Sequence, residues 1–363
     1  MTDRRRGRTI LIAPDSFKGS LTSVEVARAL GEGWRRARPD DTILLSPLAD
    51  GGEGTLAAVE AAGGWAWRRS TVHDPLGRPI EARWLWREVD GTGLAFIEMA
   101  TASGLSLIRA ADRDPMAATS VGTGELIGAA IDQGITRITL GIGGSATTDG
   151  GRGLLEGLLG SGRRLDDVDL EVACDVSNPL LGPEGAASVF GPQKGATPAQ
   201  VQELDERNAR WSDELGAREG RDERDTPGAG AAGGVGFALL SIQDRFHSFA
   251  LRPGVDMVMD LTDFDAKLAR ADLVITGEGR IDAQTGFGKT ALGVAKRAQT
   301  AGVPCVAVGG GVEPAGIEAL AAVGAVAVPV VERPQSVEEA MAAGVGPLVR
   351  CGERVGRLVG MID

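Results

Sequence analysis

Five short apolar segments with the length of β-strands each end in a loop that holds a carboxylate or a lysine, and four of these loops also hold glycine. Helix-like stretches alternate with several of them, which predicts an α/β fold with mainly parallel sheets. Open sheets of this kind bind ligands at the carboxyl ends of their strands, where loop glycines let backbone N–H groups approach an anion. The pattern therefore predicts a site for an anionic, phosphorylated and metal-bound ligand. The segments and their loops are Thr9–Ala13 with PDSFKGS (14–20), Thr42–Leu45 with LADGGEGT (48–55), Arg137–Ile142 with GGSATTDGG (143–151), Leu170–Cys174 with DVSNP (175–179), and Asp272–Thr276 with GEGRID (277–282).

The chain is long enough for two domains, because single cores stop growing at about 250–300 residues. Apolar and charged residues alternate over 79–89, and Asp90-Gly91 then turns the chain into a second apolar run. This pattern is typical of an antiparallel hairpin and marks a second domain beginning near residue 71. The strands expected over 303–308 and 325–328 are available to complete the first sheet.

We therefore expect two dissimilar α/β domains. The first is a discontinuous, Rossmann-like domain made of residues 1–70 and 286–363, and the second is an inserted flavodoxin-like domain, 71–285, with the added hairpin. The loops 14–20 and 48–55 are assigned to the first domain and the other three loops to the second. The active site is expected in the cleft between the domains.

Fifty acidic residues against 38 basic ones give a net charge of −12, which makes nucleic acid and anionic membranes poor partners. An anionic ligand then needs a local positive pocket or a metal ion. No run approaches the 18 apolar residues of a membrane span, and a cytoplasmic location is expected. Only five lysines occur, and three of them (Lys18, Lys194 and Lys289) lie in loops with glycine, where a compact ammonium group suits phosphate.

Two of the loops carry the most chemistry. GGSATTDGG directly precedes a helix, whose N–H groups and dipole favour an anion, and its Asp149 either holds a metal or caps that helix. GEGRID places Glu278 and Asp282 around Arg280, a grouping that suits Mg²⁺ and phosphate or, alternatively, an ion-pair network linking the domains. Asp175 follows its strand directly, with Asn178 nearby as an orienting amide.

Common nucleotide and nucleophile motifs fail their context tests. Gly228, Gly230 and Gly233 match GxGxxG, but no strand precedes them, and GFGKT lacks the first glycine of a P-loop. The two histidines, His73 and His247, are far from any cysteine, so proton transfer falls to carboxylates.

Six segments together resemble the type-1 glycerate kinases of bacterial glycerate and glyoxylate metabolism. The resemblance is collinear from about residue 9 to 310, and it implies ATP-dependent, Mg²⁺-assisted phosphorylation of D-glycerate to 2-phospho-D-glycerate between two dissimilar α/β domains. A homodimer is one option for its assembly. The segments are PDSFKGS, DGGEGT, GIGGSATTDGG, ACDVSNPLLGPEGAASVFGPQKGAT, GAGAAGGVG and DLVITGEGRID. Between the third and fourth of these, near Leu159–Asp166, the chain looks shorter than members of that family.

The kinase hypothesis gives these residues provisional roles, since phosphoryl transfer depends mainly on positioning and charge neutralisation. Lys18 and Arg280 neutralise the phosphoryl group or the glycerate carboxylate, and Asp175 or Asp149 accepts the hydroxyl proton. Glu278 and Asp282 hold the metal. The remaining substrate- and phosphate-binding candidates are Asp15, Ser16, Asp50, Glu53, Gly143, Gly144, Ser145, Asn178, Lys194 and Lys289.

Two other functions compete with this hypothesis. A non-catalytic sensor for a small hydroxy acid or its phosphate would need fewer loop carboxylates, and no DNA-binding or partner module accompanies the chain. An NAD or nucleotide-sugar enzyme is disfavoured by the failed fingerprint.

Overall fold

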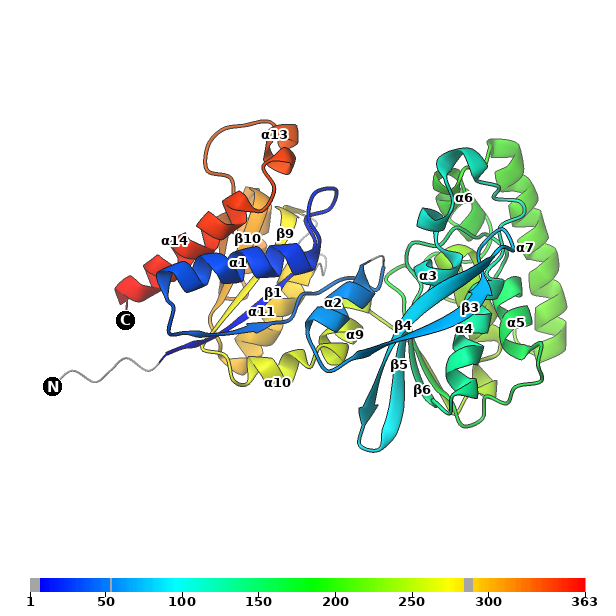
Figure 1. Ribbon diagram of the computed structural model, residues 1–363. Coiled ribbons are helices and arrows are strands. Elements are labelled where there is room, and N and C mark those ends of the chain that lie inside the picture. The colour runs from blue at the N-terminus through cyan, green and yellow to red at the C-terminus, as the bar shows by residue number, and fades with distance from the viewer. Residues whose placement is uncertain (1–6, 53, 284–289, 363) are drawn as a thin grey trace. The chain divides into compact units, whose positions relative to one another are not determined.

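The computed structural model describes residues 7–52, 54–283 and 290–362, and it divides the chain into two compact units (Figure 1). Unit 1 takes the chain up to Ala49, then Ala57–Gly63, and the chain from Val255 onward. Unit 2 takes Asp50–Leu56 and Gly64–Gly254. The expected discontinuous first domain is therefore present.

Unit 1 is built on a five-stranded, fully parallel sheet in the order β11-β10-β9-β1-β2. Strand β1, next to the central strand β9, pairs Ile10 with Leu273 of β9 on one side and with Ile43 of β2 on the other. Its strands are β1 (Thr9–Pro14), β2 (Thr42–Leu45), β9 (Leu273–Ile281), β10 (Cys305–Val312) and β11 (Ala325–Pro329).

Helices α1 and α14 lie side by side over one face of this sheet (Figure 1). A capping box begins α1: the Glu25 N–H donates to Thr22 Oγ1 at 3.2 Å, and the Thr22 N–H donates to the Glu25 carboxylate at 2.8 Å. Its apolar face buries Val26, Leu30 and Trp34 against the sheet and α14. The helices here are α1 (Ser23–Ala37), α9 (Gly254–Leu261), α10 (Phe264–Leu268), α11 (Thr290–Ala301), α12 (Pro314–Ala321), α13 (Val337–Ala342) and α14 (Gly346–Ile362), with α2 (Thr55–Ala61) crossing the division.

Unit 2 contains a six-stranded mixed sheet in the order β3-β4-β5-β6-β7-β8. The first three strands pair antiparallel and the others parallel. The predicted hairpin is confirmed, with Asp90 and Gly91 at φ of 53° and 75° in its turn. The strands are β3 (Ala66–His73), β4 (Pro79–Val89), β5 (Thr92–Glu98), β6 (Arg137–Gly141), β7 (Asp169–Ala173) and β8 (Ser248–Arg252).

The core of unit 2 joins this sheet to its helices, with Trp84, Leu126, Leu154 and Phe237 all fully buried. The long helix α7 begins with Thr197 as its N-cap and Pro198 as its first residue. The helices are α3 (Ala100–Ser103), α4 (Val121–Asp132), α5 (Arg152–Leu159), α6 (Ala186–Phe190), α7 (Pro198–Glu219) and α8 (Val235–Ser241), with short 3₁₀ turns η1 to η5 between them.

The α/β class, the mainly parallel sheets and the hairpin agree with the prediction, but the boundaries 1–70, 71–285 and 286–363 do not match the two units. The main segment of unit 2 begins at Gly64, because β3, a strand that was not predicted, pairs with β4. It ends at Gly254 because β9 pairs with β1 and β10 in the other sheet.

Two corrections follow for the loops. GEGRID is mostly strand, because β9 continues to Ile281 and pairs Arg280 with Gly311 of β10. Loops 14–20 and 277–282 therefore belong to unit 1, whereas residues 50–55, 143–151 and 175–179 belong to unit 2. The prediction had exchanged 48–55 and 277–282 between the units.

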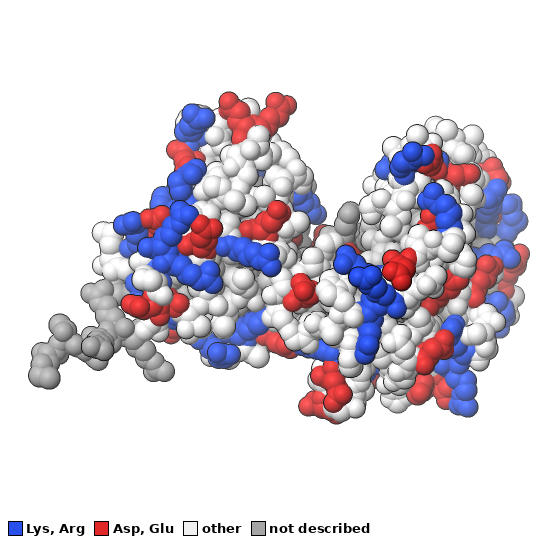
Figure 2. Space-filling view, in the orientation of Figure 1, with Lys and Arg blue, Asp and Glu red and all other residues white. Residues whose placement is uncertain are grey.

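Charged side chains of both signs occur on the visible face of each unit (Figure 2). Many are paired at the surface, as in Arg36 with Glu32 at 2.5 Å and Arg357 with Glu353 at 2.7 Å. Any attraction for an anion must therefore come from a local arrangement of groups. Within the described residues, no helix has both the length and the apolar character needed to cross a membrane.

Candidate functional site

The carboxyl ends of β6 and β7 carry most of the predicted residues of unit 2. Residues 50–52 pack directly onto these strand ends: a Cβ built on Gly143 would lie 2.4 Å from Gly52 Cα, and one on Gly51 would lie 2.5 Å from Ala173 Cβ. Only glycine fits at such approaches. The loop 50–52 and the loop 143–151 are thus held together at one sheet edge.

Gly143 and Gly144 form the turn that leaves β6. Gly144 has a φ of 72°, in the left-handed region that glycine adopts without strain, and it is exposed. Within the described chain the N–H groups of Gly143 and Gly144 donate no hydrogen bond, whereas the Gly144 carbonyl accepts one from the Leu105 N–H at 2.9 Å. Two such amides next to each other suit an anionic oxygen.

Lys194 lies beneath this turn, and its side chain is only 2% exposed. Its Nζ donates to Ser145 Oγ at 3.0 Å and to the Thr147 carbonyl at 2.5 Å. Burial lowers the pKa of Lys194 to about 8, and the Asp149 carboxylate opposes that shift. The sequence predicts that Lys194 lies in a loop facing phosphate. The structure shows that Lys194 supports the loop 143–151 from inside the unit.

Asp149 has the geometry of a cap. Its Oδ2 accepts from the Ser120 N–H and hydroxyl, both at 2.8 Å, and from the Gly153 N–H at 3.2 Å, while its Oδ1 accepts from the Gly151 N–H at 3.1 Å. Thr119 adds a weaker contact at 3.4 Å. Asp149 thereby joins the starts of α4 and α5, and its carboxylate already occupies the anion-binding end of α5. Of the two roles left open for Asp149, this geometry favours the cap.

Asp175 and Asp50 are the exposed carboxylates at this edge. Asp175 Oδ1 accepts from the Gly254 N–H at 2.9 Å, which fixes the side chain just beyond β7. Asp50 Oδ1 accepts from the Gly52 N–H at 3.2 Å. The Asn178 side chain donates to the Glu184 carbonyl at 2.8 Å, so it orders its own loop. Within the described residues it makes no hydrogen bond to Asp175.

The sequence context of the glycine-rich turn 228–234 argues against a dinucleotide-binding motif. In the structure this turn packs against two loops of the candidate site. Gly233 has a φ of 73°, and a Cβ there would lie 1.9 Å from the Thr147 carbonyl oxygen. The Gly150 N–H donates to the Gly233 carbonyl at 3.0 Å, and the Gly230 N–H donates to the Asn178 carbonyl at 2.9 Å. This turn braces the loops 143–151 and 175–179, a role that its spacing could not reveal.

In unit 1, Asp15, Ser16 and Lys18 follow the end of β1. The Asp15 N–H donates to the Gly277 carbonyl at 2.8 Å, and Asp15 Oδ2 accepts from the Thr290 hydroxyl at 2.7 Å. Asp15 Oδ1 also accepts from the Ser16 N–H at 2.6 Å. Lys18 is exposed, and a Cβ on Gly279 would lie 3.5 Å from its backbone nitrogen. The loop therefore lies directly against β9.

Glu278 and Arg280 lie two positions apart on β9 and project toward one face of the sheet, and Asp282 directly follows the strand. Glu278 is buried, with 7% of its surface exposed. Arg280 lies 3.4 Å from Asp282 and also pairs with Glu313, and these partners raise the pKa of its guanidinium, the hydrogen bond to Glu313 most. Both partners belong to unit 1, so these ion pairs do not link the units.

Glu53 and Lys289 lie outside the described residues. Among the residues that the structure describes, no group of three or more His, Cys, Asp or Glu side chains lies close enough together to hold a metal ion alone. Mg²⁺ usually needs only one or two protein carboxylates, because phosphate oxygens and water supply the other ligands. Glu278 on β9 and Asp282 directly after it fit that requirement.

Two α/β units with phosphate-type loops at their strand ends define a class of small-molecule phosphotransferases, and the comparisons with known proteins agree. The model of the glycerate kinase family matches residues 10–162 and 159–360. This chain belongs to the glycerate kinase family, and it is a kinase.

Its relatives match over most of their length. A glycerate kinase from Bacillus subtilis is 42% identical over 330 positions, covering 84% of this chain and 85% of the relative. A glycerate 2-kinase from Escherichia coli is 42% identical over 329 positions, covering 83% and 84%. The crystal structure of a provisionally assigned glycerate kinase 2 from Salmonella typhimurium LT2 superposes with a TM-score of 0.81 at 39% identity, covering 98% of this chain and 99% of that one.

The family model matches as two pieces that overlap at 159–162, within the stretch near Leu159–Asp166 that looks short in the sequence. In the structure α5 ends at Leu159, and the Gly160 N–H donates to the Glu156 carbonyl at 2.9 Å. This stretch therefore begins at the end of a helix.

Proposed function

We propose that this chain transfers the γ-phosphoryl group of ATP to D-glycerate and releases 2-phospho-D-glycerate. The observation that carries the proposal is the pair of adjacent amides of Gly143 and Gly144, held over the buried ammonium of Lys194, in a chain of the glycerate kinase family. Amide donors and a nearby cation stabilise the charge that spreads over the phosphoryl oxygens during transfer. Membership in this family also favours the kinase over the sensor.

Each unit supplies one part of the chemistry in this proposal. In unit 2, Gly143, Gly144 and Ser145 bind phosphate, and Asp175 accepts the proton of the attacking hydroxyl. We prefer Asp175 to Asp149 because Asp175 is exposed, whereas the Asp149 carboxylate already accepts four close hydrogen bonds. In unit 1, Lys18 and Arg280 neutralise negative charge on the phosphoryl group or on the glycerate carboxylate.

Glu278 and Asp282 would hold a magnesium ion together with phosphate oxygens. Bound there, Mg²⁺ would supply positive charge to offset the charge that develops between the transferred and leaving phosphates. The protein's part is to present two oxygen ligands, Glu278 on β9 and Asp282 directly after that strand.

The test incubates the protein with ATP, Mg²⁺ and D-glycerate and follows the products by ³¹P NMR, which resolves 2-phosphoglycerate from 3-phosphoglycerate. We expect the 2-phosphate, and omission of Mg²⁺ should abolish it. Formation of 3-phosphoglycerate would refute the regiochemistry alone. No phosphoglycerate of either kind would refute the kinase reaction.

A further inference from the structure

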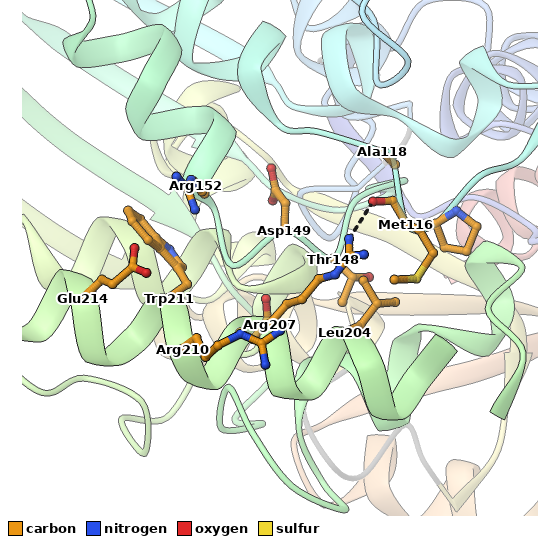
Figure 3. A pocket seen from close by; sticks show the side chains of 12 residues that line it. Met116, Ala118, Thr148, Asp149, Arg152, Leu204, Arg207, Arg210, Trp211 and Glu214 are labelled. Atoms are coloured by element: carbon orange, nitrogen blue, oxygen red, sulfur yellow. Dashed lines mark hydrogen bonds between the residues drawn. The ribbon is translucent and has the colours of Figure 1, made fainter. Parts of the chain in front are cut away.

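Unit 2 contains a pocket of about 280 Å³ that the proposed reaction does not use (Figure 3). Residues of α7 line one side of it, and Thr148 and Asp149 lie on the other (Figure 3). The segment 115–118 completes the wall. The pocket thus lies behind the loop whose other end carries Gly143 and Gly144.

Two buried side chains in this wall have polar atoms without a partner. Thr148 is 1% exposed and Asn208 is 2% exposed, and neither Thr148 Oγ1 nor Asn208 Nδ2 makes a hydrogen bond within the described chain. A buried donor left unsatisfied costs about 1–3 kcal/mol, so native proteins seldom retain one without a ligand or an ordered water. Two in one wall indicate that an acceptor group normally lies between them.

The charged side chains that line the pocket indicate which kind of acceptor group it holds. Three arginines line it, namely Arg152, Arg207 and Arg210. Arg152 bonds Glu156 at 3.1 Å and Arg207 bonds Glu203 at 2.5 Å, whereas Arg210 makes no ion pair with any described residue. Of the two carboxylates in the wall, Asp149 is already occupied by the caps of α4 and α5, and Glu214 makes no ion pair with any described residue. The Arg210 guanidinium and the two buried donors together suit an acceptor group with several oxygens.

The rest of the wall is apolar and flat. Leu204 and Trp211 are nearly buried, at 3% and 9% exposed, and Met116 lies beside them. The Trp211 ring is fixed by its N–H, which donates to the Gly150 carbonyl at 3.1 Å, and the Arg152 guanidinium lies 5.1 Å from the ring centroid. A small organic group attached to the anion has a rigid surface to contact here.

We infer that this pocket is a second binding site, which takes a small phosphate monoester. Its phosphate lies between Thr148, Asn208 and Arg210, and its organic part lies against Leu204 and Trp211. The volume accommodates a small ester but not a whole nucleoside triphosphate. Because Thr148 and Asp149 continue the loop that holds Gly143 and Gly144, an occupant also changes the affinity of that loop for its own phosphate. This last step rests on the proposed function.

The test follows the Trp211 indole N–H by two-dimensional ¹H–¹⁵N NMR. The chain has six tryptophans, and the W211F variant identifies the signal. Phenyl phosphate should shift this signal saturably and more tightly than inorganic phosphate does. The R210Q and T148V variants should weaken phenyl phosphate binding about tenfold, as expected for one lost charge-assisted bond or one buried donor. R69Q, which removes an exposed arginine of β3, should leave the affinity unchanged.

A Trp211 signal that does not move, or equal affinity in R210Q and the wild type, would overturn the inference and leave water as the partner of the buried donors. Isothermal titration calorimetry makes the same comparison if W211F does not fold. The NMR titration needs no catalysis, so a saturable shift in a protein that makes no phosphoglycerate would refute the proposed function alone. If the reaction does occur, phenyl phosphate should alter the KM for ATP in the wild type more than in R210Q.

Discussion

Lys194 Nζ donates to the hydroxyl oxygen of Ser145 at 3.0 Å, although 49 positions separate the two residues. The same ammonium donates to the Thr147 carbonyl. A side chain that is 98% buried cannot be a flexible surface cation. It is a fixed charge under the loop that presents the Gly143 and Gly144 amides, so it acts on a ligand through the geometry of that loop.

The K194M variant tests this positioning role. Methionine fills much of the space but donates no hydrogen bond, so the loop should shift and turnover should fall about a hundredfold, the cost of a misplacement of about 1 Å. Steady-state assays of kcat and KM would measure the loss. K296M removes an exposed lysine of α11 and should behave as the wild type does. Turnover at the wild-type rate in K194M would refute the positioning role of Lys194.

The buried ammonium should also make stability depend on pH. Its pKa lies near 8 in the folded chain and near its ordinary 10.5 in the unfolded chain, so the unfolded chain binds more protons between these values. The free energy of unfolding therefore rises with pH across this window, by on the order of 3 kcal/mol, and is flat below it. Urea denaturation of the wild type and K194M at pH 7 to 10 gives the difference. A difference that stays constant with pH would contradict the prediction.

D149N should reduce stability. An amide nitrogen would replace one carboxylate oxygen and face the N–H groups that Asp149 now accepts, leaving them unpaired at the starts of α4 and α5. We expect the free energy of unfolding to fall by about 1–3 kcal/mol. Urea denaturation measures it, with D166N as the control, because Asp166 forms only an exposed pair with Arg164. Unchanged stability in D149N would show that the cap contributes little.

D175N should instead reduce turnover while the fold remains intact. Its side-chain oxygen can still accept from the Gly254 N–H, but the amide cannot take a proton from the attacking hydroxyl. General-base catalysis is worth about 10² to 10⁴ in rate, and kcat should fall within that range. Circular dichroism and the unfolding midpoint would confirm an intact fold. If kcat instead stays near the wild-type value, another group is the base.

The K18M variant tests whether the Lys18 ammonium group of unit 1 neutralises charge during phosphoryl transfer. Its loop lies against Gly279 of β9, beside the residues proposed to hold metal and phosphate. Removing a preorganised group that stabilises transition-state charge costs about 10² to 10³ in kcat. K296M is again the matched control, since it removes the same charge from an exposed helix position. Equal kcat for K18M and K296M would remove Lys18 from the site.

The strands that determine the fold were readable because they are apolar runs that end in loops with a carboxylate or a lysine, most of which also hold glycine. β3 was missed because it lies at the sheet edge and exposes Trp67, Arg68 and Arg69, so its sequence resembles a loop. β9 was recognised but assigned to the wrong unit, because position in the chain does not show which sheet a strand joins.

The candidate site was predictable by residue type but not by role. The sequence singled out Asp149 and Lys194, yet only the structure shows that one caps two helices and the other supports a loop from inside. These roles depend on partners about 30 and 49 positions away, such as Ser120 and Ser145. The pocket beside α7 could not be predicted from the sequence, since it requires Thr148 of one loop and Asn208 of α7 to line the same cavity.

The pairing of β1 with β9 has a consequence for biosynthesis. The Thr276 hydroxyl donates to the Ala13 carbonyl across 263 positions, so the sheet of unit 1 cannot close until β9 has left the ribosome. Unit 2 is complete in sequence by then and can form first, since domains generally fold as units during synthesis. Until that moment β1 has an exposed apolar edge, the kind of surface on which chaperones act. Translation through residues 255–312 is therefore the step at which a nascent chain of this family is most prone to aggregate.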